Sequence, residues 1–579
     1  MPTCITPLTK PFQALLKNSG KIVAFVLAVG LLLFPIPNQV KAAAGDLDPA
    51  FGDGGRVFTE FPDPLGGPSS CFATDVEMQG DGKIITVGGV ITENASDFAL
   101  TRHDSQGLLD SSFGNMGRVT TDFSRSATEL GFDRANALAI QPDGKVIAVG
   151  TSQVLQGSRA LNLVLARYHT DGSLDRNFGK GGKVIGFTVS SIFDSAVALQ
   201  SDGKIVVTGL TFQNNHEVIL VVRYNPNGSL DGTFGSGGKV ITDLNGDCGR
   251  LYCASIARAV EIQPDNKIIV AGLHVVNDEN SDLAILRYER DGSLDTSFGN
   301  GGKVIMDLGN DDEDVALDLA LQPDRKIIAV GSSGFGVNAR RNFALIRFNP
   351  DGSLDSSFGT NGQVLTDFST PFTNRDDVAS TVVIQPNGKL VAAGYSILGS
   401  GGLPDMAIAR YHSDGSLDLS FGSGGKVITF FSLAEGSASY VSALALQSDG
   451  KIIAAASAGV PGSFGIFRQR QVLVRYQGDP IPDFDICLQD DSSRDTLKFN
   501  SNTGDYLFTQ CSGFSIIGRG ILTKRGCIIA LQDYSLDRRV LVQTDRCLSR
   551  GFASIQLYAV GTIITITDRN VTNNACSCN

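Results

Sequence analysis

Residues 294–308, LDTSFGNGGKVIMDL, and residues 314–333, DVALDLALQPDRKIIAVGSS, contain the pattern that decides the fold. From Val315 to Leu321 large apolar residues alternate with small or polar ones, which is the period-2 signature of a β-strand. The next residues, Pro-Asp-Arg-Lys, predict a tight hairpin, because Asp bonds its own backbone and favours a turn. The segment FALIRF at 343–348 predicts a further strand. The unit is therefore expected to contain four short strands.

The same unit recurs along the chain in steps of about 60 residues, and such self-similarity is the signature of a repeat architecture. Three sequence markers recur in the same order in every unit. The phenylalanine of an LD-x-x-FG signature lies at Phe51, Phe113, Phe178, Phe234, Phe298, Phe358 and Phe421. A glutamine before the turn lies at Gln79, Gln141, Gln200, Gln263, Gln322, Gln385 and Gln447. An arginine, mostly followed by tyrosine, lies at Arg102, Arg167, Arg223, Arg287, Arg347, Arg410 and Arg475.

Seven units of four strands, filling residues 45–478, predict an all-β, seven-bladed β-propeller with four strands per blade. A solenoid is the structural alternative. Solenoids usually begin and end with atypical capping repeats, whereas the first and last units here keep the full pattern, which favours a closed ring.

These units resemble the delta-60 repeat of secreted and surface proteins of bacteria, whose pattern is close to FGxGGKV, QPDGKIVVAG and FALARYxxDGSLDxSFG. The resemblance covers residues 45–478, and the second to sixth units carry nearly all of the pattern. It implies a β-propeller and an exported protein, and it implies no particular activity.

Composition excludes several functional classes. The chain of 579 residues has a formal net charge of −12 and a sequence pI near 5.0, so it lacks the clustered basic residues that nucleic-acid binding requires. With 42% hydrophobic residues it is not a mainly disordered chain, and its 67 glycines indicate many turns. The absence of tryptophan removes the side chain on which many glycan-binding propellers rely.

Residues 1–44 are predicted to be a signal peptide. Four lysines and no acid accompany an uncharged apolar run from Ile22 to Phe34, and small residues suited to signal peptidase follow at Val40, Ala42 and Ala44. The run would reach only about 20 Å as a helix, short of the ~30 Å hydrocarbon core. We therefore expect a secreted or cell-surface protein without a membrane span after cleavage.

The repeated aspartate of LD-x-x-FG is predicted to be structural, because a carboxylate just before free backbone N–H groups caps a turn. The repeated arginine is expected to reach a carboxylate or a carbonyl in its own or the next blade. The aspartates are Asp48, Asp110, Asp175, Asp231, Asp295, Asp355 and Asp418.

If the four strands alternate in direction, the tight turns and the LD-x-x-FG connections share one face, and the irregular loops lie on the other. Binding usually resides on variable loops held by a rigid frame, so this loop face is the predicted site. The loops are Pro62 to Ala73, Ser124 to Arg134, Asn245 to Ser255, Asn277 to Asp282, Asn310 to Asp314, Ser369 to Asp377 and Ala458 to Gln471.

Within that face Asp311, Asp312 and Asp314 are candidate ligands for Ca²⁺, which favours six to eight oxygens. A solvated acidic loop is the alternative interpretation, because no D-x-D-x-D-G spacing is present. No nucleophile, zinc or hydrolase motif accompanies the five histidines, His103, His169, His216, His274 and His412, so no catalytic residue is assigned.

Residues 479–579 are predicted to form a small β domain supported by disulfides, because six cysteines occur in a short exported segment with alternating strands. Its cysteines are Cys487, Cys511, Cys527, Cys547, Cys576 and Cys578. Cys248 and Cys253 are expected to bridge within one loop, which leaves Cys71 either free or joined to the tail.

Two functions follow from these patterns. The favoured one is a secreted, non-catalytic propeller that binds a protein or glycan on a surface through its variable loops, with the C-terminal domain used for attachment. The alternative is an extracellular lyase or hydrolase acting at the channel mouth, which a convergent set of polar side chains or perturbed carboxylates there would favour.

Overall fold

The computed structural model describes residues 43–479 apart from short internal segments, and beyond residue 479 it describes the backbone of eight strands. The internal segments outside the description are 63–68, 93–94, 125–130, 155–160, 194, 214–215, 245–253, 278–279, 310–312, 335–340, 369–375, 398–402, 432–438 and 462–466. Residues 1–42, most of the predicted signal peptide, also lie outside it.

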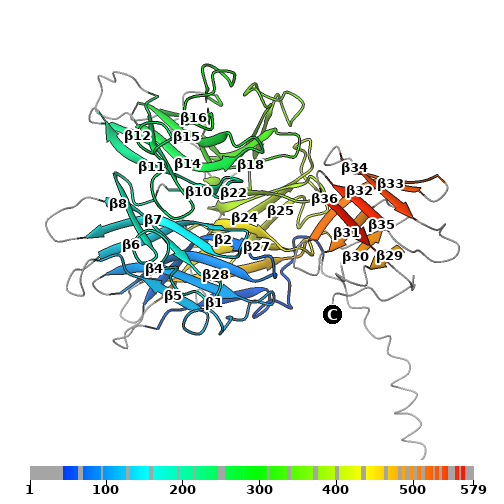
Figure 1. Cartoon of the computed structure of the whole chain (residues 1–579), viewed down its shortest axis with the longest axis horizontal. Helices are drawn as coiled ribbons and strands as arrows, with labels where there is room; N and C mark the ends of the chain where they lie inside the picture. Colours follow the sequence, from blue (N-terminus) through cyan, green and yellow to red (C-terminus); the bar gives the residue numbers. More distant parts are fainter. Residues whose placement is uncertain are drawn as a thin grey trace, which may run out of the picture. The chain divides into compact units, whose positions relative to one another are not determined.

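The described chain is all-β and propeller-like, with four-stranded antiparallel meanders that we call blades (Figure 1). The first four are β2 (Ser70–Met78), β3 (Ile84–Ile91), β4 (Ser96–His103), β5 (Arg118–Thr121); β6 (Gly131–Ile140), β7 (Val146–Val154), β8 (Leu161–Tyr168), β9 (Lys183–Val189); β10 (Val197–Leu199), β11 (Ile205–Gln213), β12 (His216–Tyr224), β13 (Lys239–Thr242); and β14 (Ala254–Ile262), β15 (Ile268–Asn277), β16 (Asn280–Tyr288), β17 (Lys303–Met306). The next are β18 (Asp314–Leu321), β19 (Ile327–Ser333), β20 (Asn342–Phe348), β21 (Gln363–Thr366); β22 (Asp377–Ile384), β23 (Leu390–Ser396), β24 (Asp405–Tyr411), β25 (Lys426–Thr429); and β26 (Ser439–Leu446), β27 (Ile452–Pro461), β28 (Phe467–Tyr476), with β1 (Arg56–Thr59) as fourth strand.

The last meander is completed by the first strand of the chain. β1 pairs antiparallel with β28, from Arg56 opposite Val474 to Thr59 opposite Gln471. In every unit the GGKV-type strand pairs with the strand that precedes the LD-x-x-FG signature, so each sequence repeat begins on the outer strand of the preceding blade. The N-terminal and C-terminal ends of the repeat region therefore share one sheet, which closes the array without a capping repeat.

The strand that precedes each Gln turn is the innermost strand of its blade. β2, β6, β10, β14, β18, β22 and β26 each contact the next of these strands, and β26 contacts β2 in turn. The sequence did not predict which strand would be innermost.

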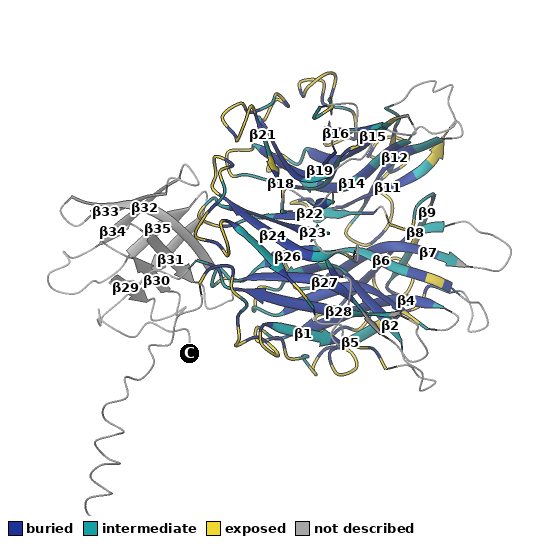
Figure 2. Cartoon of the chain, turned by 180° about the vertical axis from the view of Figure 1, so that it is seen from behind, coloured by how far each residue is buried: buried dark blue, intermediate teal, exposed yellow. Residues whose placement is uncertain are grey.

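The core lies between neighbouring blades. Ile85, Val87 and Phe98 of one blade pack against Ala135 and Ala148 of the next, so large side chains of one sheet face small ones of its neighbour. This arrangement confirms the predicted alternation of large and small residues. Figure 2 shows the buried residues concentrated in the strands and the exposed ones in turns and loops.

The repeated arginine, aspartate and phenylalanine form one cluster per blade. In the fifth blade Arg347 Nε donates to Asp355 Oδ2 at 2.7 Å, its guanidinium lies 4.6 Å from the Phe358 ring centroid, and its Nη1 donates to the Ser413 carbonyl of the next blade. Ser357 N donates to Asp355 Oδ1 at 3.1 Å, which is the predicted turn cap. The predicted structural roles of the repeated aspartate and arginine are both confirmed.

The cluster also joins the ends of the repeat region. Arg475 Nε lies 2.8 Å from Asp48 Oδ2, and its Nη1 donates to the Ser105 carbonyl of the first blade. The seven repeated arginines are all buried, with at most 7% of the residue surface exposed. A buried guanidinium requires a hydrogen-bonded counter-charge, so this cluster constrains how each blade meets the next.

Beyond residue 479 the described strands form a second antiparallel meander. Its order is β29 (Ile486–Gln489), β30 (Thr496–Phe499), β31 (Asp505–Thr509), β32 (Ser515–Arg525), β33 (Ile528–Asp533), β34 (Arg538–Thr544), β35 (Ile555–Ala559) and β36 (Thr562–Ile566). The predicted β character of this segment is confirmed, whereas its disulfides stay a prediction.

We expect Arg347→Met to lower the free energy of unfolding by about 3–5 kcal/mol, because it leaves the buried Asp355 without its main counter-charge. Urea denaturation followed by circular dichroism measures the loss. Arg176→Met is the matched control, since Arg176 is exposed and its loss should stay within about 0.5 kcal/mol. An equal effect of the two substitutions would contradict a structural role for the cluster.

Candidate functional site

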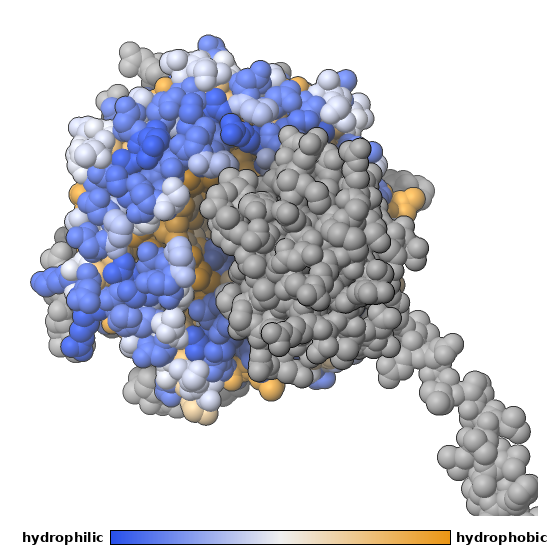
Figure 3. All heavy atoms as spheres, turned by 45° about the vertical axis from the view of Figure 1, so that its right-hand side comes forward, coloured by the Kyte–Doolittle hydropathy of each residue, from blue (hydrophilic) through white to orange (hydrophobic). Residues whose placement is uncertain are grey.

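Four acidic side chains line one cavity formed by the innermost strands. Asp75 and Glu77 lie on β2, Glu261 on β14 and Asp318 on β18, and the cavity has a volume of about 740 Å³. The lining also includes residues of β22 and β26, so strands distant in the sequence converge there. In Figure 3 the hydrophilic surface of the described residues surrounds a hydrophobic furrow. We call the cavity lined by the four acids the acidic channel site.

The acids occupy positions that other units fill with small or uncharged residues. Counting back from the turn glutamine, Asp75 and Asp318 stand four residues before it and Glu77 and Glu261 two residues before it. At these positions the remaining residues are Ala137, Ala139, Ala196, Ala198, Ala259, Ala320, Thr381, Val383, Ala443 and Ala445. This contrast, visible once the repeats are aligned on the glutamine, is the signal that the sequence interpretation missed.

The backbone of the inner strands holds these carboxylates in place. Asp75 Oδ1 accepts from Val76 N at 2.8 Å, and its Oδ2 accepts from Leu138 N of the next blade at 2.8 Å. Asp318 repeats the arrangement with Leu319 N at 2.8 Å and Val382 N at 2.9 Å. Each aspartate directly follows a β-bulge. The bulge gives the strand a local kink that re-aims a side chain.

Burial raises the pKa of all four groups, and repulsion from a neighbouring carboxylate adds to it in Asp75, Glu77 and Glu261. Desolvation is the main cause in each case, raising the pKa of Asp75 to about 7, Glu77 to about 8, Glu261 to about 7 and Asp318 to about 6. Repulsion from Asp75 adds to the shift of Glu77, and repulsion from Asp318 adds to that of Glu261. Among the described lining residues Arg325 is the only basic one. The site is therefore short of positive charge.

We expect the unliganded protein to lose stability as the pH rises from about 5 to 8. A carboxyl whose folded pKa lies above its unfolded value near 4 binds more protons when folded, so its ionisation favours unfolding in this window. Thermal melting at pH 5 and pH 8 measures the fall in Tm. This fall should be smaller in Glu77→Gln than in the wild type. The raised pKa values would be contradicted if the Tm of the wild type rose from pH 5 to pH 8 and the Tm of Glu77→Gln changed in the same way.

Part of every predicted variable loop lies outside the described residues, so the loop-face site stays a prediction. Of the candidate calcium ligands, Asp311 and Asp312 also lie outside them. Asp314 is fully buried at the start of β18, where its Oδ2 accepts from Leu308 N at 2.5 Å. Asp133 and Asp377 make the same contact with Phe123 N and Phe368 N, so Asp314 has a repeated structural role. Calcium binding by the three aspartates stays a prediction.

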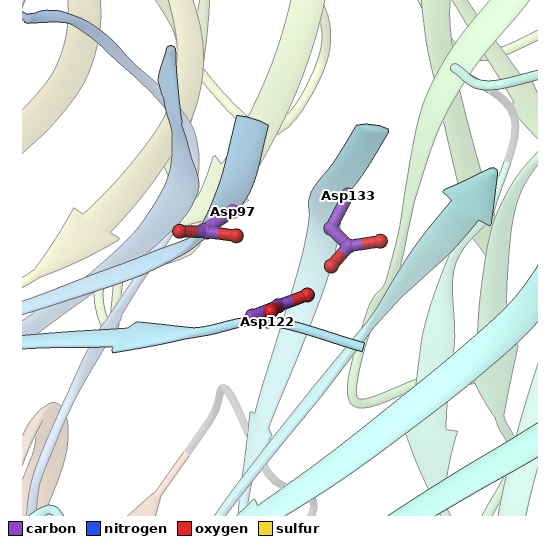
Figure 4. Close-up of side chains that lie close together, drawn as sticks. All are labelled: Asp97, Asp122 and Asp133. Carbon is purple, nitrogen blue, oxygen red and sulfur yellow. The ribbon is translucent and has the colours of Figure 1, made fainter. Parts of the chain in front are cut away.

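A separate group of three carboxylates could hold a metal ion by its geometry. Asp97, Asp122 and Asp133 each offer one oxygen, and these atoms all lie within 4.8 Å of one another (Figure 4). Backbone N–H groups already hold Asp133 and Asp122, since Phe123 N donates to the first and Ser124 N to the second, both at 2.6 Å. Burial raises the pKa of Asp97 to about 6 and that of Asp133 to about 7, so protonation relieves part of their repulsion.

The structure does not assemble a catalytic site from the histidines. His103 is buried and bonds Thr59 Oγ1 at 3.0 Å, and burial lowers its pKa to about 4. It stands where other repeats place a tyrosine, such as Tyr168, whose hydroxyl bonds Thr121. His216 lies 2.9 Å from Asp243. None of the five histidines lines the acidic channel site.

Cys71 is a free, buried cysteine whose Sγ donates to the Thr59 carbonyl at 3.2 Å. Burial raises the pKa of its thiol, so it is held as a neutral group within the blade. Cys248 and Cys253 lie outside the described residues, and the side chains of the six tail cysteines are not described. Their disulfides therefore stay predictions.

The fold and the repeat define the chain as a β-propeller repeat protein. Six segments match the family model described as "Domain of unknown function (DUF5122) beta-propeller", namely residues 79–113, 141–178, 200–234, 263–298, 322–358 and 385–421. Each segment runs from the turn glutamine to the phenylalanine of FG. No curated protein matches the sequence.

Several solved structures are similar in fold at low identity. A streptogramin B lyase is 12% identical with a TM-score of 0.37 over 72% of this chain and 97% of its own. The polysaccharide lyase Uly1 is 10% identical with a TM-score of 0.40 over 76% and 95%. The GH93 α-L-arabinofuranosidase of Fusarium graminearum is 11% identical with a TM-score of 0.34 over 58% and 92%. These similarities carry no inference about activity.

Among the described residues no helix is long and apolar enough to cross a membrane.

Proposed function

We propose that the protein is an exported, non-catalytic binding propeller with seven blades, and that its ligand presents a positively charged group to the acidic channel site. The observation that carries this proposal is the convergence of Asp75, Glu77, Glu261 and Asp318 on one cavity with raised carboxyl pKa values. A cation bound there supplies positive charge, of which the described lining contributes only that of Arg325.

Charge and shape both support a cationic ligand. Desolvated carboxylates gain most from a partner that arrives with its own charge, since the interaction strengthens in a low dielectric. The cavity of about 740 Å³ leaves room for a side-chain-sized group, and Arg325 is exposed at the rim. The net charge of −12 favours the approach of cations over a wide area. A basic segment of a surface protein is the ligand class that fits these features.

We expect a tetralysine peptide to bind the wild-type protein and Asp318→Asn to weaken its Kd at least tenfold, because the variant removes a desolvated charge from the site. Affinity should rise from pH 5 to 8, since the lysines stay charged while the carboxyls lose protons. Isothermal titration calorimetry measures both effects.

Two controls make this experiment decisive. Asp143→Asn removes an exposed acid from a turn between inner strand β6 and strand β7 and should leave Kd unchanged. Fully acetylated tetralysine keeps the shape of the peptide but not its charge and should not bind. Equal binding of the two peptides, or no binding of either, would overturn the proposed ligand class.

A second candidate function is hydrolysis or lyase chemistry at the same cavity, and the raised carboxyl pKa values favour it. Carboxyl groups poised near neutral pH serve as general acids and bases, and paired carboxylates perform glycoside hydrolysis. The described lining contains no histidine and no second cation to support such a pair. We therefore place it second.

If the cavity is catalytic, the wild-type protein should release reducing sugar from a polysaccharide panel, and Glu77→Gln should lower the rate by about 100-fold or more through loss of the acid. A reducing-end assay detects the product. Matched activity in wild type and Glu77→Gln would exclude this role for the channel acids.

The remaining parts of the chain complete the proposed function. Residues 1–44 direct export as a signal peptide, residues 45–478 form a delta-60-type repeat propeller, and residues 479–579 form a disulfide-stabilised domain for attachment or interaction with a surface. The strands of the tail and the repeat pattern support this division. The loop face remains available for a protein or glycan partner of its own.

A further inference from the structure

Arg134 is one of two arginines on the described inner strands, and aromatic residues surround it. It lies on β6, seven residues before the turn glutamine. The same repeat position holds Phe72 in the preceding blade, Phe193 in the following one and Tyr440 on β26. Phe72, Arg134 and Tyr440 thus lie on neighbouring innermost strands that are in contact, and Phe193 lies in the segment that leads into β10.

The guanidinium of Arg134 is fixed between two rings. Its central carbon lies 4.3 Å from the Phe72 ring centroid and 4.9 Å from the Phe193 centroid. Its Nε donates to Asn136 Oδ1 at 3.0 Å. Asn136 Nδ2 in turn donates to the Ile192 carbonyl and to Ser195 Oγ, both at 2.9 Å. One edge of the guanidinium is thus anchored by an amide that is itself held in place.

This arginine has no counter-charge among the described residues. The seven repeated arginines each lie against an aspartate, whereas within the described part of the chain the Arg134 side chain forms no ion pair and no hydrogen bond besides that of Nε. Burial lowers its pKa, which is the direction expected of a cation without an anionic partner. The guanidinium is therefore held in position, while its terminal N–H groups have no acceptor among the described residues.

We propose that Arg134 is the anion-binding group of a second ligand site, at the opposite end of the channel from the acids, and that its ligand is a carboxylate. A guanidinium fork binds a carboxylate through two parallel hydrogen bonds in one plane. The rings of Phe72 and Phe193 cover the guanidinium from the two neighbouring blades, which leaves a thin slot suited to a planar group. A tetrahedral phosphate fits such a slot less well.

The ligand class is narrowed by Phe193. Its side chain is 59% exposed although it stacks on Arg134, so one face of the ring remains open beside the fork. A flat apolar face next to a carboxylate-binding fork suits the ring of an acidic sugar, whose C–H groups pack on aromatic faces. The structure thus assigns a uronate-type carboxylate to this slot.

The two ends of the channel are separate sites. Arg134 stands three residues before Ala137 on β6, the residue at the repeat position of Asp75, and a β-bulge lies between the two. Arg134 is not among the residues that line the acidic channel site. Loss of tetralysine binding and loss of carboxylate binding can therefore be observed independently.

The test is isothermal titration of the full chain with trigalacturonate. We expect wild-type binding, with Kd weakened at least tenfold by Arg134→Met and also by Arg134→Lys, because lysine keeps the charge but loses the fork. Phe193→Ala should weaken binding by a smaller factor. Arg258→Met is the matched control, since Arg258 is also a partly buried inner-strand arginine with a lowered pKa, and it should bind as wild type.

Two further ligands complete the experiment. The methyl ester of trigalacturonate has the same rings without the charge, and it should not bind. Inorganic phosphate should compete only weakly. Unchanged binding in Arg134→Met, equal binding of the ester, equal binding of phosphate, or no binding of trigalacturonate to the wild type would each overturn the proposal. A circular-dichroism melt of every variant shows whether the protein is folded at the titration temperature.

Discussion

The propeller depends on one buried interaction, the ion pair between the repeated arginine and the aspartate of LD-x-x-FG. Each guanidinium is removed from water, so it must be neutralised and hydrogen-bonded where it lies. The aspartate supplies the charge, a phenylalanine covers the face of the guanidinium, and in six of the blades a carbonyl of the next blade takes a further N–H. Because that carbonyl belongs to the neighbour, the same cluster that completes one blade also positions the next.

The sixth blade shows how strict this requirement is. Arg410 Nη2 donates to the carboxylate of Asp479 at 2.7 Å, whereas its Nη1, the atom that binds a backbone carbonyl in the other six arginines, has no hydrogen-bond partner among the described residues. Asp479 also lies 2.9 Å from Lys389 Nζ. Asp479, which directly follows the last repeat, thereby gives this arginine a second carboxylate besides Asp418, and it extends the charge network to the boundary of the repeat region.

Against this background the functional candidates are departures from the repeat. Asp75, Glu77, Glu261 and Asp318 replace residues that are mostly alanine elsewhere, and they bring negative charge into a cavity without compensating cations among the described lining residues. Arg134 stands where other units have an aromatic or aliphatic residue, and it brings a cation that has no anionic partner among the described residues. A repeat protein tolerates such substitutions, because the units that keep the pattern stabilise the fold.

The sequence by itself determined the repeat unit, its four strands, its turns and the structural roles of Asp and Arg, because those features follow from local periodicity and from side chains close to their partners in the chain. Only the tertiary structure decided that β1 completes the last blade, which strand is innermost, and that the four channel acids meet in one cavity. Closure brings together residues of different units, and no local pattern records which of them will face one another. The guanidinium slot of Arg134 likewise required segments from different repeats, since Phe72 lies on β2 and Phe193 in the segment that leads into β10.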